Sequence, residues 1–339
     1  MTPLTDFELP AELEAGQPPE ARGLARDEVR LLAAGRDGLR HARFSGLGQF
    51  LRPGDVLVVN TSATLAAAID GRRPDGTLVV AHFSTLLDDG SVLVELRPPG
   101  RATGPVTDGR AGERIGLAAG AVLVLRQAES ARLWRAWVAV EGDLRSYLAM
   151  HGRPITYAYV DGSWPLAAYQ TVFARDPGSA EMPSAGRPFS PDLVTALVAS
   201  GVVIVPVTLH TGVSSLEAGE PPLREWFQIP EPTAELVAHS RRADRRIIAV
   251  GTTVTRALES GTAADGTTAA AGGWTDLVLG PDRPARAVDG IITGWHAPGA
   301  SHLDLLAAVA GPALVADAYA EAIRHRYRWH EFGDSCLLL

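Results

Sequence analysis

Hydrophobic and polar positions alternate in short segments over the first part of the chain. The segment LRPGDVLVVN places a Pro-Gly-Asp turn before four apolar residues, Val56 to Val59, which predicts a strand. TLLDDGSVLVEL predicts a hairpin with Asp89 and Gly90 at its tip. ERIGLAAGAVLVL and ARLWRAWVAV predict further short strands. Short strands separated by Gly, Pro and Asp turns are typical of a small barrel or sandwich.

The pattern changes after Glu141, where apolar residues recur every three or four positions. Helices are predicted for DLRSYLAMHG, SPDLVTALVASG, TAELVAHSRRADRR, SHLDLLAAVAG and VADAYAEAIRHRYRW. The apolar segments VVIVPVTLH, IIAV, LVLG and DGIITGW lie between them and predict strands. The alternation of helix and strand predicts an α/β fold with a partly parallel sheet. GTAADGTTAAAGG, Gly261 to Gly273, is small and polar, and we interpret it as a mobile loop.

The two patterns together predict a fold class that is α/β plus all-β, a mixed α/β domain with an inserted small β-barrel domain. The α/β domain is discontinuous and comprises residues 1–60 and 145–339, and the barrel comprises residues 61–144. Ligands of open α/β sheets bind outside the carboxyl ends of the parallel strands. We therefore expect a ligand between the two domains, at those strand ends.

Composition narrows the classes of partner. The 339 residues carry a net charge of −8, and the chain contains arginine but no lysine. Nonspecific RNA binding is therefore not expected, although the net charge does not exclude a local groove lined by arginines. Cys336 is the single cysteine, which excludes an intrachain disulfide and a cysteine-based metal cluster. The histidines are scattered, so no metal is expected. No signal peptide or membrane-spanning stretch is predicted, which favours a cytoplasmic protein without a membrane partner.

Three of the predicted strands end in polar residues, and these residues are candidates for ligand binding or catalysis. These residues are Thr208, His210 and Gly212 in VTLHTG, Gly251, Thr252, Thr253 and Arg256 in VGTTVTR, and Thr293 and His296 in ITGWH. A Gly-Thr-Thr turn at a helix start presents unpaired N–H groups and two hydroxyls, which suits a carboxylate or phosphate. The alternative is ordinary N-capping by Thr252 or Thr253.

Acid–base chemistry has three candidates. His210 and His296 follow apolar strands, although a lone histidine is more often a structural group. Glu225 lies beside two aromatic residues, where burial would raise its pKa; the alternative is an exposed carboxylate paired with Arg224. The chain has no P-loop, no G-x-G-x-x-G after a strand and no G-x-S-x-G elbow, so these nucleotide and hydrolase classes are excluded.

Further motifs occur in one order with these clusters: LRPGDVLVVN, YQTVFA, PSAGRPFS, VTLHTG, AVGTTVTRALES, DGIITGWHAP and AYAEAIRHRYRWHEFGDSCLL. Together they resemble the S-adenosylmethionine:tRNA ribosyltransferase-isomerase family of queuosine biosynthesis over nearly the whole chain. The G-T-T-x-x-R-x-L-E-S and Y-R-[FW]-x-x-[FY]-G-D motifs are the most specific part of this resemblance.

The resemblance implies a β-barrel domain and an α/β domain with the active site near their junction. It implies S-adenosylmethionine as a co-substrate, without a metal, whose ribosyl part is attached to the aminomethyl group of a 7-deazaguanine base in tRNA while adenine and methionine leave. The catalytic candidates become His210, Glu225 and His296. The substrate-binding candidates become Tyr169, Gln170, Ser184, Gly186, Thr208, Gly212, Gly251, Thr252, Thr253, Arg256 and Thr293.

The chain departs from the family pattern at several positions, and four of these departures lose an arginine or a histidine. Ala63 and Ala68 stand where the family has arginines, and Pro188 and Leu223 stand where it has histidines. Losing an arginine removes a bidentate contact to phosphate or carboxylate, which weighs against tRNA as the partner. Two alternatives therefore stay open: a paralogous enzyme that uses S-adenosylmethionine with a small-molecule acceptor, and a catalytically silent binding protein of the same fold.

Overall fold

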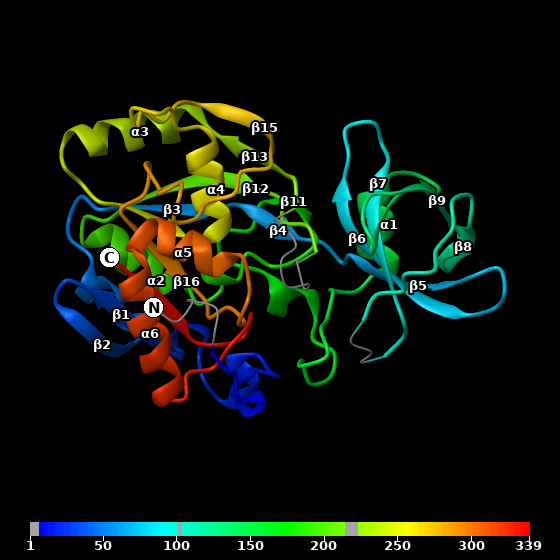
Figure 1. The fold of residues 1–339 in the computed structure, drawn as a ribbon, viewed down its shortest axis with the longest axis horizontal. Helices are drawn as coiled ribbons and strands as arrows, with labels where there is room; N and C mark the ends of the chain where they lie inside the picture. The colour runs from blue at the N-terminus through cyan, green and yellow to red at the C-terminus, as the bar shows by residue number, and fades with distance from the viewer. Residues whose placement is uncertain (1–6, 101–103, 214–222) are drawn as a thin grey trace.

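Two bodies lie side by side in the computed structural model, which describes residues 7–100, 104–213 and 223–339. A large α/β body and a smaller all-β body are joined through the middle of the molecule by strands β4 (Ser62–Thr64) and β11 (Asp176–Ser179), as Figure 1 shows. These two strands pair in parallel and form a small sheet of their own. The predicted fold class is confirmed.

A nine-stranded sheet in the order β15-β13-β12-β3-β14-β16-β17-β1-β2 forms the centre of the α/β body. The strands β12, β3, β14 and β16 are parallel neighbours, so their carboxyl ends meet at one edge. The strand bounds are β1 Arg30–Gly35, β2 Gly38–Arg43, β3 Val56–Asn60, β12 Val203–Leu209, β13 Glu225–Ile229, β14 Ile247–Val250, β15 Ala271–Thr275, β16 Gly290–Thr293 and β17 Ser335–Leu338.

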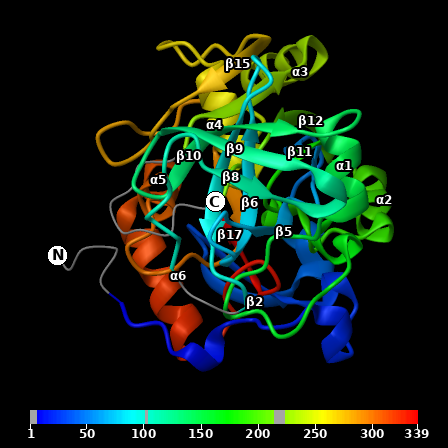
Figure 2. The same cartoon turned by 90° about the vertical axis from the view of Figure 1, so that its right-hand side faces the viewer.

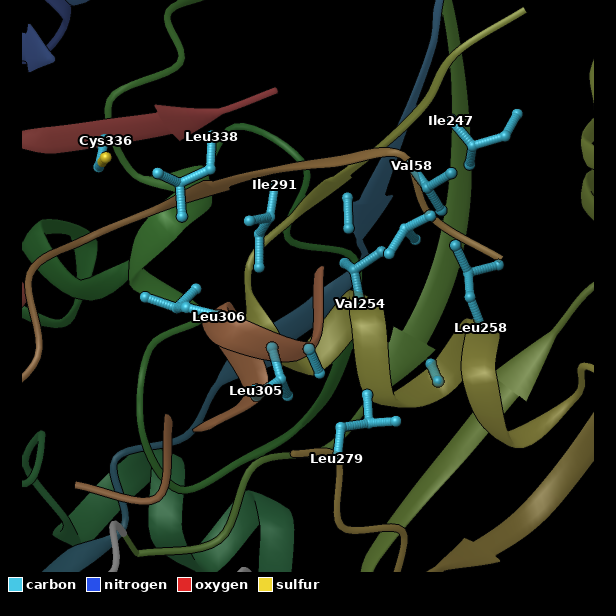
Figure 3. Close-up of a cluster of buried hydrophobic side chains, with 14 of the residues drawn as sticks. Val58, Ile247, Val254, Leu258, Leu279, Ile291, Leu305, Leu306, Cys336 and Leu338 are labelled. Atoms are coloured by element: carbon cyan, nitrogen blue, oxygen red, sulfur yellow. The ribbon is translucent and has the colours of Figure 1, made fainter. Parts of the chain in front are cut away.

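Helices cover both faces of this sheet. Because successive residues of a strand point to opposite faces, neighbouring residues pack into different clusters. Val58 packs into the cluster formed with helices α3 (Glu231–Arg242), α4 (Thr252–Ser260), α5 (His302–Ala310) and α6 (Pro312–Arg324). Its neighbours Leu57 and Val59 pack on the other face, against α2 (Pro191–Ala199). Figure 3 shows part of the first cluster, to which Val254 and Leu258 of α4, Ile291 of β16 and Leu305 of α5 contribute side chains.

Local capping sets where the helices begin. Ser190 accepts a hydrogen bond from the backbone N–H of Leu193 at the start of α2, and Pro191 occupies the first turn. Asp143 caps α1 (Leu144–His151) in the same way through Ser146. The other short helical segments are 3-10 turns at Ala11–Leu13, Pro19–Arg22, Arg26–Glu28, Phe44–Phe50, Ala118–Gly120, Leu166–Tyr169 and Ser184–Gly186.

The second body is a closed barrel in the order β10-β7-β6-β5-β8-β9, which faces the viewer in Figure 2. Its strands are β5 Ala68–Arg72, β6 Leu78–Leu86, β7 Val92–Arg97, β8 Arg114–Gly116, β9 Val122–Ala128 and β10 Leu133–Ala139. The β6–β7 hairpin turns at Asp89 and Gly90, and its neighbour Asp88 accepts a 2.8 Å hydrogen bond from the indole of Trp274 in β15. This Asp88–Trp274 bond ties the barrel rim to the large sheet.

Three expectations need correction. The segment LVLG forms no strand, because Leu277–Gly280 lies beyond the end of β15 and Leu277 gives its carbonyl to the Arg256 side chain instead. Residues 261–273 are more regular than a loop: Thr262 and Thr268 form a β-bridge, and the end of the segment enters β15. The helix predicted over VADAYAEAIRHRYRW ends at Arg324, and Arg326 takes a φ of 54° that reverses the chain.

The domain boundaries stay a prediction. Helix α1 packs Leu148 into the hydrophobic cluster of the barrel, although the predicted barrel domain stops at residue 144. Within the described residues, no single helix is long and apolar enough to cross a membrane; α5 and α6 reach that length only as a pair bent by 119°.

Candidate functional site

A cavity of about 290 Å³ lies between the two bodies. Ile155 and Val213 line it and belong to the core of the barrel. Leu279, Trp295 and Leu305 line it from the core of the α/β body. The cavity is therefore built at the junction, beside the carboxyl ends of β12, β14 and β16, where a ligand was expected.

The cavity brings together ten of the fourteen predicted site residues. They are Tyr169, Ser184, Gly212, Glu225, Gly251, Thr252, Thr253, Arg256, Thr293 and His296. The other four, Gln170, Gly186, Thr208 and His210, lie outside its lining. Sequence motifs thus located most of the cavity, and the four exceptions have physical reasons.

His210 and Thr208 point away because strand residues alternate. Val207 and Leu209 face the core cluster of α3 and α4, so Thr208 and His210 face the opposite side of β12. The His210 ring stacks on Trp226 at 5.2 Å, and its Nδ1 lies 2.7 Å from the Ser62 hydroxyl. Burial lowers the pKa of His210 to about 4, so the ring is neutral at pH 7.

Gln170 and Gly186 have structural contacts of their own. The Gln170 side chain donates to the carbonyl of Thr64 at 2.8 Å and accepts from its N–H at 3.0 Å, which continues the pairing of β4. A Cβ at Gly186 would lie 3.3 Å from the Thr171 methyl group, so this position serves close packing. Neither residue lines the cavity, and their role in substrate binding stays a prediction.

The start of helix α4 forms an uncapped N-terminus in the cavity wall. Gly251 is the N-cap residue with a φ of 103°, a conformation that glycine adopts readily, and no side chain caps the helix. Within the described residues, Thr252 and Thr253 are not N-caps, so the alternative of ordinary threonine capping does not apply. The first N–H groups and the helix dipole are left to attract an anion from the cavity.

Arg256 and Glu225 form a buried ion pair behind this helix start. Glu225 also accepts the Gly212 N–H at 3.0 Å. The remaining Arg256 donors reach backbone carbonyls, including Leu277 and Leu223, each at 3.0 Å. Burial raises the pKa of Glu225, while Arg256 opposes that rise. Because both groups are directed to protein atoms, the pair holds β13, α4 and the segment after β15 together.

His296 lies in a cluster of neutral imidazoles. Its Nε2 is 3.0 Å from the Thr293 hydroxyl, and its ring is parallel to that of His302 at 4.4 Å. Burial lowers the pKa of His296 well below its usual value and that of His302 to about 4. These rings therefore stay uncharged at pH 7 and serve as hydrogen-bond donors and acceptors.

Two carboxyl–tyrosine pairs that were not predicted also line the cavity. Tyr159 donates its hydroxyl hydrogen bond to Glu331 and stacks on His330 at 4.1 Å, while Tyr157 donates to Glu181. Burial raises the pKa of Glu331 to about 7, which makes this carboxyl group able to take and give a proton at neutral pH.

The sequence carried a weak signal for these groups. His330 and Glu331 fall inside the specific motif YRWHEFGD, and Tyr157 and Tyr159 alternate in ITYAYV, as in a strand with one wet face. Pairing of the tyrosines with Glu331 and Glu181 depends on the fold, because Glu331 is 172 positions from Tyr159.

The cavity is thus suited to a ligand with both signs of charge. The α4 N-terminus favours a carboxylate, and Glu181 and Glu331 favour a positive centre. Neutral imidazoles and tyrosines complete the lining of the cavity.

Comparison with known proteins gives one family. The profile described as Queuosine biosynthesis protein matches residues 4–338. Proteins named S-adenosylmethionine:tRNA ribosyltransferase-isomerase from Rubrobacter xylanophilus, Thermus thermophilus and Moorella thermoacetica are 35%, 34% and 32% identical to the chain. Each alignment covers 98% of this chain, and 96%, 98% and 98% of the relative, respectively.

A solved structure agrees with this result. The crystal structure of S-adenosylmethionine tRNA ribosyltransferase from Thermotoga maritima has a TM-score of 0.56 and 28% sequence identity to this chain. The match covers 99% of this chain and all of the other.

Proposed function

The chain belongs to the queuosine biosynthesis protein family, and from this premise we propose that it is an S-adenosylmethionine:tRNA ribosyltransferase-isomerase. It transfers the ribosyl part of S-adenosylmethionine to the aminomethyl group of a 7-deazaguanine base in tRNA, isomerises it, and releases adenine and methionine. The observation that carries the proposal is the junction cavity, whose lining offers an anion seat and titratable carboxyl groups. A cytoplasmic location stays a prediction.

The amino-acid tail of S-adenosylmethionine belongs at the start of α4. Its carboxylate accepts the free N–H groups of the first helical turn, beside Gly251 and Thr253. Arg256 lines the cavity, but its donors are directed to Glu225 and to backbone carbonyls, so it supports the seat by ordering Glu225. The seat is therefore made by backbone groups.

Removing the ligand carboxylate tests this seat. We expect decarboxylated S-adenosylmethionine to bind about 10–100-fold more weakly, because one charge-assisted set of hydrogen bonds is lost. Isothermal titration calorimetry of both compounds measures the ratio. Equal affinities would show that the tail binds elsewhere.

Glu331 is our candidate for the general base. The sulfonium acidifies the hydrogens of the adjacent ribose carbon, and the Glu331 carboxylate takes one of these protons. A carboxyl group with a pKa near 7 is a stronger base than an ordinary one and returns the proton readily to the departing adenine. The uncharged His296 and His302 are suited to accept a hydrogen bond from the aminomethyl group, whose nitrogen must be neutral to attack.

A small-molecule acceptor is the second candidate function, and the arginine positions favour it. Ala63 and Ala68 are buried, and two arginines near the altered motifs in the sequence are occupied: Arg73 pairs with Glu113, and Arg187 pairs with Glu20. They therefore do not replace the missing guanidinium groups. Arg153, whose backbone pairs with Ala68, has a side chain at the surface that is paired with Asp70.

Adenine release distinguishes the functions. We expect the purified chain to release adenine from S-adenosylmethionine when tRNA carrying the aminomethyl-7-deazaguanine base is present, and to lose tRNA affinity as salt is raised. High-performance liquid chromatography of adenine, with and without this tRNA, measures it. Release with the free base alone would support the small-molecule enzyme, and no release with either acceptor would support a silent binding protein.

A further inference from the structure

Three side chains with metal-binding atoms converge far from the cavity, at the edge of the large sheet. His41 comes from β2, while Glu321 and His325 come from the end of α6. Their ligand atoms all lie within 4.8 Å of one another. Glu321 Oε1 is 2.9 Å from His41 Nε2 and 3.0 Å from His325 Nε2. Two imidazoles and one carboxylate are a common ligand set of zinc.

Hydrogen bonds from outside the cluster orient two of these ligands. The Nδ1 atom of His41 is 2.8 Å from the Tyr327 hydroxyl, which in turn donates to the carbonyl of Leu31. His41 Nε2 points at the Glu321 carboxylate oxygen, and either a proton on Nε2 or a cation can bridge these two atoms. The second Glu321 oxygen pairs with Arg324, which holds the carboxylate in place.

We propose that His41, Glu321 and His325 bind a Zn²⁺ ion, or a similar transition metal, that fastens α6 to the edge strand β2. The three side chains supply three of the four tetrahedral positions, and water completes the fourth. Metal binding displaces the protons that bridge the cluster and leaves both imidazoles neutral. Arg324 and Arg30, which lies over the Tyr327 ring at 4.1 Å, place positive charge nearby and weaken the binding of a cation.

This site is independent of the proposed function, because none of its three residues lines the junction cavity. It was not visible in the sequence, where the histidines looked scattered. His41 is 280 positions from Glu321 in the sequence. The two side chains meet only because α6 packs against the β1–β2 edge of the sheet.

Titration of the metal-stripped full chain tests the proposal. We expect Co²⁺ to give the intense visible bands of a four-coordinate site, with one ion per chain displaced by Zn²⁺, and Zn²⁺ to raise the unfolding temperature. His41→Ala and His325→Ala should each weaken Zn²⁺ binding at least about tenfold, and Tyr327→Phe should weaken it by roughly tenfold through loss of ligand orientation.

His239→Ala provides the matched control, since His239 is an exposed helical histidine in α3. Its Zn²⁺ affinity should equal that of the wild type. The proposal is overturned if the wild type shows no saturable binding in the micromolar range, or if His41→Ala and His325→Ala bind Zn²⁺ as tightly as His239→Ala does. Because His41 and His325 are exposed, both variants are expected to fold.

Discussion

Glu331→Gln is expected to slow adenine release by about 10²–10⁴-fold, while the dissociation constant of S-adenosylmethionine changes little. Glutamine keeps the shape of the side chain and an oxygen that accepts the Tyr159 hydrogen bond, but it cannot take a proton. The loss should therefore appear in kcat under saturating tRNA. Steady-state kinetics combined with calorimetric binding separates the two effects.

The pH dependence gives a second measure of the same group. Wild-type activity should rise with pH through about 7 as Glu331 loses its proton, and the glutamine variant should lack this step. The folded pKa is raised from 4.5, so the folded chain retains a proton that the unfolded chain has released. The stability from this group is thus full below pH 4.5 and is lost as pH rises through about 7.

Glu141→Gln is the control, because Glu141 is exposed and lies outside the cavity lining. It should match the wild type in rate and in pH profile. If Glu331→Gln turned over as fast as this control, another group would be the base, and His296 would become the leading candidate.

Arg256→Met is expected to lower the free energy of unfolding by about 3–5 kcal/mol, because it leaves Glu225 as a buried charge without its partner. The backbone carbonyls of Leu277 and Leu223 lose their donors as well. Urea denaturation, followed by circular dichroism, measures the loss. Arg153→Met removes an exposed ion pair with Asp70 and should cost less than about 1 kcal/mol.

The double variant Arg256→Met, Glu225→Gln tests the mechanism. The glutamine removes the uncompensated charge and still accepts the Gly212 N–H, so we expect it to recover much of the stability. A double variant as unstable as Arg256→Met alone would mean that the lost carbonyl contacts, and not the buried carboxylate, account for the effect.

Local pattern predicted most of the fold. Turn residues such as Asp89 and Gly90, and the Ser-Pro-Asp start of α2, act within a few positions, so their effect is visible in the sequence. LVLG failed because an apolar run becomes a strand only beside a partner, and the chain places the Arg256 side chain there instead. The order of the sheet strands needs contacts over hundreds of positions and was not predictable from such signals.

The candidate site was likewise predictable where neighbouring residues determine the structure, and not where contacts between distant residues determine it. Gly251, Thr252 and Thr253 were found because a strand end and a helix start adjoin in the sequence. The pairing of Arg256 with Glu225 was not predicted, because Glu225 lies 31 positions away, on strand β13. His210 was assigned to the cavity from its place after a strand, but strand alternation turns its ring to the other face.

The Asp88–Trp274 bond at the barrel rim bears on how a bulky acceptor reaches the cavity. It is a solvent-exposed contact between side chains, and such bonds contribute only about 0.5–1.5 kcal/mol. Separating the β6–β7 hairpin tip from β15 therefore costs much less free energy than unfolding either of the two bodies. The β4–β11 pair still connects the two bodies when this bond is broken, so we expect the rim of the junction to widen for a bulky acceptor without unfolding of either body.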